Sequence, residues 1–510
     1  MQTLGPFPSP SNAELEMNHD SINENAHSLL HFPRNRAVWW VALAILVSRL
    51  LLISFAVHLA GDDGDRYLKE GSNLIRYGIF SHYPLRSGHN IPGETGYNLT
   101  GPAQASDSGG SDSRNPQPTA HDLPAYPVIL AGLVFLLKDL WVVARVAAVL
   151  NAIGFTIAAI ELYGCIRLAG APRRVAVWAM VFLGISPESF PYSVFHMPES
   201  FFLAAFLGCI GLVVLYLREP RPATLLLAFA LLGFTVLLKP ISLFFFGPVV
   251  VLICVRYCNG ANRARVAVAL FLSLLLETAI LCPWLVRNYR VFGTFSLCTV
   301  TGNNLFYINY PTMLADQGLS GEAIKSLQLE RLSAVEKDPG FQTNAMVRAN
   351  ALQKIATLEI VRHPFACAKS VTKRAPRLYV GTGVFASLQL LGRMPDNIPM
   401  DDHRRLAVLR RLNSVSLCSI LAWALLAALY LLAARGLVRL LRQHLWPVLI
   451  LACVPLFYFT LMYGPVTASA RYRLLVTPFL AILAGFGAGG GGSSLSLPVN
   501  VLGSGPPDLS

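Results

Sequence analysis

The chain alternates between long apolar segments and shorter polar connections. Most of the apolar segments approach the ~20 residues that an α-helix needs to cross a bilayer, so they predict membrane-spanning helices. They cover residues 38–60, 141–165, 174–190, 198–217, 222–238, 241–257, 265–285, 414–434, 445–464 and 474–489. The pattern predicts an all-α polytopic membrane protein with about ten transmembrane helices.

Composition supports this fold class. Of the 510 residues, 54% are hydrophobic and only 14% are charged, and the mean hydropathy is +0.52. Soluble chains of this size are less apolar. The net charge of +13 accompanies no basic recognition helix and no zinc-ligand spacing. Membrane lipids, and not nucleic acid, are therefore the expected surroundings.

Positive residues fall in alternate connections, which predicts the orientation. They are Arg34 and Arg36, Arg173 and Arg174, Arg218 and Arg221, Arg263 and Arg265, and Arg435, Arg439 and Arg442. Because positive loops stay in the cytoplasm, both termini are expected there and loops 61–140 and 286–413 on the opposite face, periplasmic or lumenal. The absence of endoplasmic retrieval signals and a compact outer segment favour a bacterial inner membrane.

The chain divides into five parts. The two tails, which are polar or rich in Gly and Ser, are expected to be flexible and to carry no chemistry. The parts are tail 1–36, helices 1–7 in 37–290 with outer loop 61–140, a helical cap on the outer face in 291–413, helices 8–10 in 414–489, and tail 490–510.

Residues 123–137 are apolar but short, and they contain Pro124 and Pro127. They predict a juxtamembrane or re-entrant helix on the outer face. If they formed a full span, every later loop would change sides and the distribution of positive charge would no longer fit.

An acidic cluster follows the first apolar segment, in GDDGDRYLKEGSNLIRYGIFS at 61–81. Asp62, Asp63 and Asp65 place carboxylates at a membrane surface, where ionised groups are cheap to hold and can transfer protons. The same residues could instead solvate a helix end or cap the helix that begins near Arg66.

Several motifs resemble the GT-C glycosyltransferases, polytopic enzymes that take a sugar from a polyprenyl-phosphate carrier. The resemblance extends over most of residues 38–489. It is carried by Asp63, Tyr67, Gly71, Leu74, Gly78, Phe80 and Ser81, and then by PTAHDLPAYP (118–127), PWLVRNYRVFG (283–293), TGNNLFYINYP (301–311) and ARYRLLVTP (470–478). The protein O-mannosyltransferases and lipid A aminoarabinose transferases belong to this group.

The resemblance implies roles for acidic residues. Asp63 matches the family's catalytic carboxylate, which would take a proton from the acceptor hydroxyl while the carrier phosphate leaves from the opposite face. Asp62 or Asp65 could be the base instead. Asp122 stands where the family more usually has Arg, before a Pro-Xaa-Tyr-Pro element whose Tyr126 is a candidate for substrate binding.

FHMPES (195–200) contains a further acidic position. In related transferases an acidic residue here lies near the active site, so Glu199 and His196 could bind acceptor or a metal. Glu199 could equally be a helix N-terminal carboxylate favoured by the helix dipole. A divalent cation is permitted, but no ligand spacing requires one, and metal ligands are left open.

Cationic groups at the expected outer surface suit a lipid phosphate, which gains charge as the sugar leaves. They could instead extend toward lipid headgroups. The candidates are Lys239, Arg287, Arg290, Arg471 and Arg473, with Asn288 between two of them.

The sequence leaves open whether two pairs of residues contact each other. Arg49 and Glu161 lie within apolar spans, where they could pair with each other or line the carrier groove. Cys298 and Cys367 both lie in the second outer loop and could form a disulfide.

The expected function is that of a GT-C membrane glycosyltransferase, for hexosyl or pentosyl units, with inversion at the anomeric carbon. The donor would be a polyprenyl-phosphate-linked sugar and the acceptor a lipid, glycan or protein. A transporter or flippase of lipid-linked sugars is the alternative, although no internal repeat is seen. An inactive relative that acts as an assembly partner is the third possibility.

Overall fold

The computed structural model describes residues 35–60, 63–82, 118–257, 263–393, 413–463 and 469–489. All regular elements in these residues are helical, as expected for the all-α class. Residues 1–34 of the first predicted tail, the whole second tail 490–510, Asp62 and residues 83–117 lie outside the described residues.

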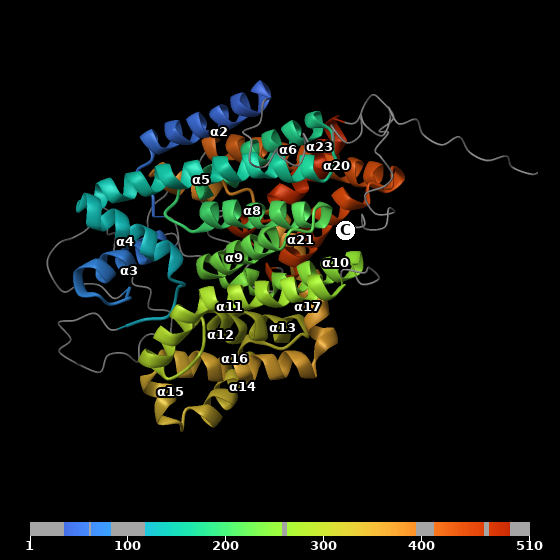
Figure 1. Ribbon diagram of the computed structural model, residues 1–510. Helices are drawn as coiled ribbons and strands as arrows, with labels where there is room; N and C mark the ends of the chain where they lie inside the picture. Colours follow the sequence, from blue (N-terminus) through green and yellow to red (C-terminus); the bar gives the residue numbers. More distant parts are fainter. Residues whose placement is uncertain are drawn as a thin grey trace, which may run out of the picture.

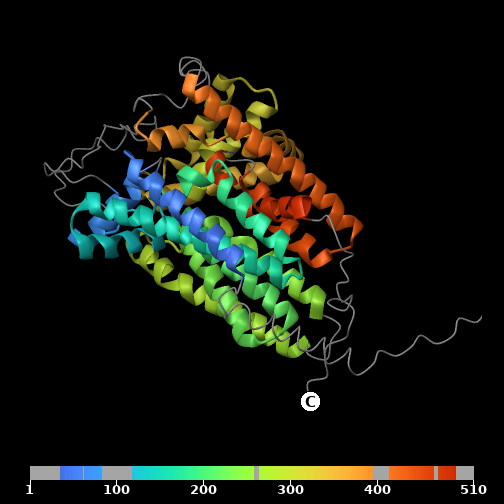
Figure 2. The same ribbon diagram turned by 90° about the horizontal axis from the view of Figure 1, so that it is seen from above.

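Seven described helical segments are long and apolar enough to cross a membrane. Each coincides with one of the predicted spans. They are α2 (Arg36–Phe55), α5 (Leu140–Leu168), α8 (Glu199–Arg218), the turn η2 (Pro240–Phe245) with α10 (Phe246–Tyr257), α11 (Arg263–Phe292), α20 (Asn413–Arg442) and α21 (Trp446–Tyr463). Figure 2 shows the long helices running side by side. The protein is thus an all-α polytopic membrane protein.

The other three predicted spans form shorter helices, α6 (Arg173–Ile185), α9 (Pro222–Leu238) and α23 (Thr477–Gly489). Prolines explain two of the ends. A residue before proline avoids the helical conformation, and Ser186 and Lys239, which precede Pro187 and Pro240, are both extended. These breaks leave polar side chains at helix ends.

Residues 123–137 form α4 (Ala125–Leu137), a helix of 13 residues that is too short to be a full span. It packs on α5 and on α3 (Gly64–Tyr77), and both α3 and α4 lie at one edge of the molecule (Figure 1). A Cβ on Gly71 would come within 2.9 Å of the Ala131 nitrogen. A glycine is therefore needed where α3 meets α4.

The segment predicted to form a cap contains a group of short helices beside α11, called the cap below (Figure 1). Phe306, Tyr310, Met313 and Leu352 are central to its own apolar core. Its helices are α12 (Val300–Asn304), the π turn η3 (Leu305–Asn309), α13 (Tyr310–Asp316), α14 (Gly321–Val335), α15 (Pro339–Thr343), α16 (Ala345–Arg362), α17 (Pro364–Val380) and α18 (Val384–Leu390).

A single large apolar core joins α2, α5, α6, α8, α9, α21 and α23. Helix α23 also packs tightly on α20. A Cβ on Gly436 would come within 1.8 Å of the Leu483 carbonyl oxygen, so the backbones of α20 and α23 touch. Such close approach through small residues is typical of packed membrane helices. Two short helices, α7 (Ser189–Tyr192) and α22 (Ala470–Arg473), lie in the connections.

Neither of the two pairs that the sequence left open forms. Arg49 donates to the Gly184 carbonyl and the Ser189 hydroxyl, both at 2.6 Å, while Glu161 lies against Gly208 on α8. The α6 break supplies Arg49 with these acceptors, so it needs no carboxylate. Cys298 and Cys367 are both free thiols. They belong to different apolar clusters, which explains why no disulfide joins them.

Candidate active site

Six charged side chains form one continuous network. The Lys239 ammonium lies 2.8 Å from Glu199 Oε1, which also accepts from Arg471 Nε at 2.5 Å. A short contact joins Arg471 Nη1 to Asp63. The other Asp63 oxygen accepts from Arg66 at 2.9 Å, and Arg66 continues to Asp122. Three cations and three carboxylates therefore alternate, so their formal charges cancel.

Five of the six members come from a helix end or a helix break, and Asp122 lies in the connection before α4. Asp63 precedes α3, and Arg66 lies in the first turn of α3. Glu199 is the first residue of α8, and Lys239 is the extended residue between α9 and η2. Arg471 belongs to the single turn of α22. Helix ends bring polar groups together here without placing them in the apolar middle of a span.

The network is buried at both ends, where the side chains of Lys239 and Asp122 are 9% and 6% exposed, and it is most exposed in between. The Glu199 side chain is completely buried and that of Arg471 is 8% exposed, whereas those of Asp63 and Arg66 are 25% and 22% exposed. A ligand from solution would therefore meet Asp63 first. Glu199 Oε2 has no hydrogen-bond partner among the described residues.

The electrostatics of Asp63 follow from its two partners. Burial alone would raise its pKa, but the guanidinium groups of Arg471 and Arg66 outweigh burial and hold the pKa well below the ordinary range of an aspartate. Glu199 and Asp63 in turn raise the pKa of Arg471 despite its burial. Asp63 and Arg471 are thus both fully ionised, and Asp63 is a weak base as long as Arg66 and Arg471 contact it.

A second polar cluster adjoins the network at Asp122 and was not predicted. It contains Glu70, His82 and His121; His82 Nδ1 lies 3.5 Å from Glu70 Oε1, and the two imidazole rings are 5.7 Å apart. Burial and the Asp122 carboxylate raise the pKa of Glu70, whereas burial lowers the pKa of His82 to about 4. The described residues contain no group of three or more potential ligands arranged to hold a metal ion.

The spacing along α3 could have revealed this cluster. Arg66 is three residues after Asp63 and Glu70 is four residues after Arg66, so all three share one helix face. Asp65, in contrast, is exposed in the first turn of α3.

Other predicted site residues lie outside the network. Arg287 donates to the Thr119 carbonyl at 2.9 Å, and Asn288 donates to the Ser296 carbonyl at 2.7 Å, so both hold loops in place. Arg290 is exposed.

Two more candidates are held by α5. His196 Nε2 contacts the Ala144 carbonyl at 2.8 Å. The Tyr126 hydroxyl accepts from Asn151 at 3.0 Å, and its ring meets Tyr67 edge to face. Both side chains are buried, and they pack behind the network.

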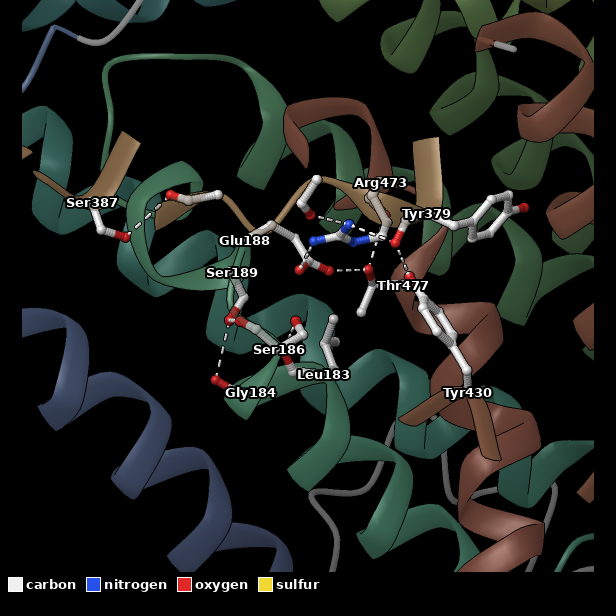
Figure 3. A network of polar contacts seen from close by, with 12 residues as sticks. Leu183, Gly184, Ser186, Glu188, Ser189, Tyr379, Ser387, Tyr430, Arg473 and Thr477 are labelled. Atoms are coloured by element: carbon white, nitrogen blue, oxygen red, sulfur yellow. Dashed lines mark hydrogen bonds and ion pairs between the residues drawn. The ribbon is translucent and has the colours of Figure 1, made fainter. Parts of the chain in front are cut away.

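Arg473 differs from Arg471 although the two residues share one helical turn. Figure 3 shows it among Glu188, Thr477 and the end of α17. It is completely buried and donates to Glu188 at 2.7 Å and to the Tyr379 carbonyl at 3.1 Å. Of the five predicted cations, Lys239 and Arg471 join the network, and Arg66 is the cation that the sequence did not suggest.

Fold and site together define a polytopic α-helical membrane protein with a charged centre built from helix ends. No protein-family model matches the chain, and no curated protein does either. Among solved structures, it is similar to archaeal oligosaccharyltransferase AglB from Archaeoglobus fulgidus in complex with an inhibitory peptide and a dolichol-phosphate, with 16% identity and a TM-score of 0.42. That match covers 87% of this chain and 50% of the archaeal one.

The apo form of the same oligosaccharyltransferase gives 16% identity and a TM-score of 0.43, again over 87% of this chain and 50% of that one. ArnT from Cupriavidus metallidurans bound to undecaprenyl phosphate gives 14% identity and a TM-score of 0.36, over 89% of this chain and 78% of that one. The chain spans about half the length of the archaeal protein.

Proposed function

We propose that this protein is a membrane glycosyltransferase of GT-C type that moves a sugar from a polyprenyl-phosphate carrier to the hydroxyl group of a lipid, glycan or protein. The observation that carries the proposal is the contact between Arg471 and Asp63, the most exposed side chain of the network, backed by Lys239. A base and a phosphate-binding cation must lie side by side for this reaction, because both act at one anomeric carbon.

The chemistry divides between these residues. Asp63 takes the proton of the acceptor hydroxyl as its oxygen attacks the anomeric carbon. The bond from that carbon to the carrier phosphate breaks, and the electron pair leaves with the phosphate oxygen on the opposite face, which inverts the centre. Arg471 and Lys239 stabilise the charge that the departing phosphate gains. The leaving group needs no proton, so one base is sufficient.

Binding of the donor would also change Asp63. The donor phosphate competes with the Asp63 carboxylate for the Arg471 guanidinium, which lies between Asp63 and the buried Glu199. When the phosphate takes this guanidinium, Asp63 loses one of the two cations that depress its pKa. The carboxylate then becomes a stronger base, and the gain occurs only when a donor is present.

The sugar is a hexosyl or pentosyl unit, and the carrier is a long polyprenyl chain held by the surrounding membrane. We place the protein in a bacterial inner membrane with cytoplasmic termini, in accord with the alternating positive loops. No observation on the described residues favours the transporter or flippase alternative.

Transfer assays test the proposal. Membranes with wild-type protein, Asp63→Asn or no protein would receive a panel of radiolabelled polyprenyl-phosphate sugars. Loss of a general base lowers rates by about 10²–10⁴-fold, so transfer should appear with wild type and fall by ~100-fold or more in the variant. Asp338→Asn is the matched control, since Asp338 caps the remote helix α15 and asparagine caps equally well.

Two results would count against the proposal. Unchanged transfer in Asp63→Asn would remove the base from this position. If wild-type membranes transferred none of the sugars, the protein would not be the enzyme described here.

A further inference from the structure

A buried ion pair outside the network joins three parts of the fold (Figure 3). Glu188 lies between α6 and α7, and Arg473 is the last residue of α22. Both side chains are completely buried, with Arg473 Nη2 2.7 Å from Glu188 Oε2. The Thr477 hydroxyl, at the start of α23, donates to the other Glu188 oxygen. The pair thus connects α22 and α23 to the connection after α6.

The third part is the end of α17, within the cap. Arg473 Nη1 donates to the carbonyls of Tyr379 and Gly381, where α17 ends. The Tyr430 hydroxyl of α20 donates to the same Tyr379 carbonyl at 2.5 Å. The last carbonyls of a helix lack partners within the helix, and a cation there is favoured by the helix dipole. Arg473 is therefore the cationic partner that ties this end of α17 to the transmembrane body.

Backbone contacts show how closely the cap approaches this pair. Gly383 adopts a positive φ of 73°, and a Cβ on it would lie 3.2 Å from the Glu188 Cα. A Cβ on Gly381 would lie 3.2 Å from the Ala470 nitrogen. The chain that leaves α17 is thus pressed against Glu188 on one side and α22 on the other. Small changes in this pair would move the cap.

Stability is a poor explanation for such a pair. Two fully buried charges lose their hydration, and well-packed apolar residues of similar volume are often as stable or more stable. Helix α22 suggests another reason. It is only four residues long, and it carries Arg471 on one side toward Glu199 and Asp63 and Arg473 on the other toward Glu188.

We propose that Glu188 and Arg473 are positioning residues that fix α22 against the end of α17, so that Arg471 on the same helical turn holds the donor phosphate in register with Asp63. This inference rests on the proposed function for its catalytic consequence, while its structural part stands independently. A misplacement of ~1 Å can cost a reaction about a hundredfold in rate.

The main test replaces the pair by apolar residues, Glu188→Met with Arg473→Met. Hydrogen exchange of residues 364–390 should become faster than in wild type, because the end of α17 loses its tie to the body. The thermal midpoint should stay near the wild-type value, and kcat for transfer should fall by roughly tenfold to a hundredfold. A role in stability alone would lower the midpoint and leave kcat unchanged at temperatures far below it.

Two further variants make the test decisive. Thr477→Val removes one hydrogen bond to Glu188 and retains both charges, so it should give a smaller change of the same kind even if the double variant fails to fold. Asp316→Asn breaks an ion pair within the cap, with Lys373 and Arg374, and does not touch the proposed tie. It should leave kcat near the wild-type value.

The outcomes separate the two proposals. Wild-type exchange rates in the double variant and in Thr477→Val, or a fall in kcat no larger than in Asp316→Asn, would overturn the positioning role while the transferase proposal stands. If the wild type transfers no sugar, the proposed function fails. Hydrogen exchange then decides the structural part without any activity measurement.

Discussion

Replacing Asp63 by asparagine should tighten the binding of polyprenyl phosphate even though transfer is lost. In the structure the Asp63 carboxylate, the most exposed side chain of the network, already contacts the Arg471 guanidinium. An incoming phosphate must displace this carboxylate before it can bind Arg471. Asparagine keeps the shape of the side chain but gives up the negative charge, so the phosphate meets less competition.

The size of the effect follows from the contact that is broken. A hydrogen bond to a charged group contributes about 1.5–3 kcal/mol. The Asp63 side chain is 25% exposed, and solvent screening favours the lower end of that range. A change of about 1.4 kcal/mol corresponds to a factor of ten in the dissociation constant. Asp63→Asn should thus bind the phosphate roughly tenfold more tightly.

Isothermal titration calorimetry on detergent-solubilised protein would measure this constant, with polyprenyl phosphate as the ligand and no sugar attached. Asp338→Asn, which makes the same change at the cap of α15, should bind like wild type. Equal or weaker binding by Asp63→Asn would refute the idea that phosphate and Asp63 compete for Arg471. The increase in base strength on donor binding would fall with it.

Three other predictions concern stability. Glu199→Gln leaves the buried Lys239 and Arg471 without a carboxylate between them, which should lower the free energy of unfolding by about 3–5 kcal/mol. The thermal midpoint in detergent should fall far more than in the control Glu322→Gln, in the exposed first turn of α14. Arginines lower the folded-state pKa of Asp63, so the stability that Asp63 contributes is complete above its unfolded pKa of about 3.9 and disappears as the pH falls through its folded-state pKa. The difference in thermal midpoint between wild type and Asp63→Asn should therefore be constant from about pH 7 to 5 and shrink only below about pH 4. A decline in this difference already at pH 6 would contradict the prediction. Gly436→Ala should prevent stable packing of α20 on α23, because the added Cβ would lie 1.8 Å from a carbonyl oxygen of α23. Gly247→Ala is the control, since its Cβ would have no atom within 4 Å, and size-exclusion profiles of the two variants should differ accordingly.

The fold was largely predictable because a bilayer imposes one strong requirement on sequence. Every described helix that is long enough to cross coincides with an apolar segment. Lengths were less predictable, although Pro187 and Pro240 are visible signals for the ends of α6 and α9. The partner of Arg49 could not be foreseen, since its acceptors are a carbonyl and hydroxyl groups that become available only when α6 breaks.

The candidate site was predictable in part, for a related reason. Asp63, Glu199, Lys239 and Arg471 lie at helix ends or breaks, and the structure brings these four together. Arg473 was expected beside Arg471, but residues two positions apart on a helix face different directions, and only one of the two faces Glu199. Their roles in binding and catalysis remain predictions.

The contact between Asp63 and Arg471 joins residues 408 positions apart. During synthesis the first helices enter the membrane long before α22 has left the ribosome, so Asp63 meets its cation only after nearly the whole chain has been made. Until then Glu199 has Lys239 as its single cationic partner from the network. A chain that ends before residue 470 would contain Asp63, Glu199 and Lys239 but lack the Arg471 guanidinium that joins the two carboxylates. The charged network is therefore complete only when the last part of the described chain has been made.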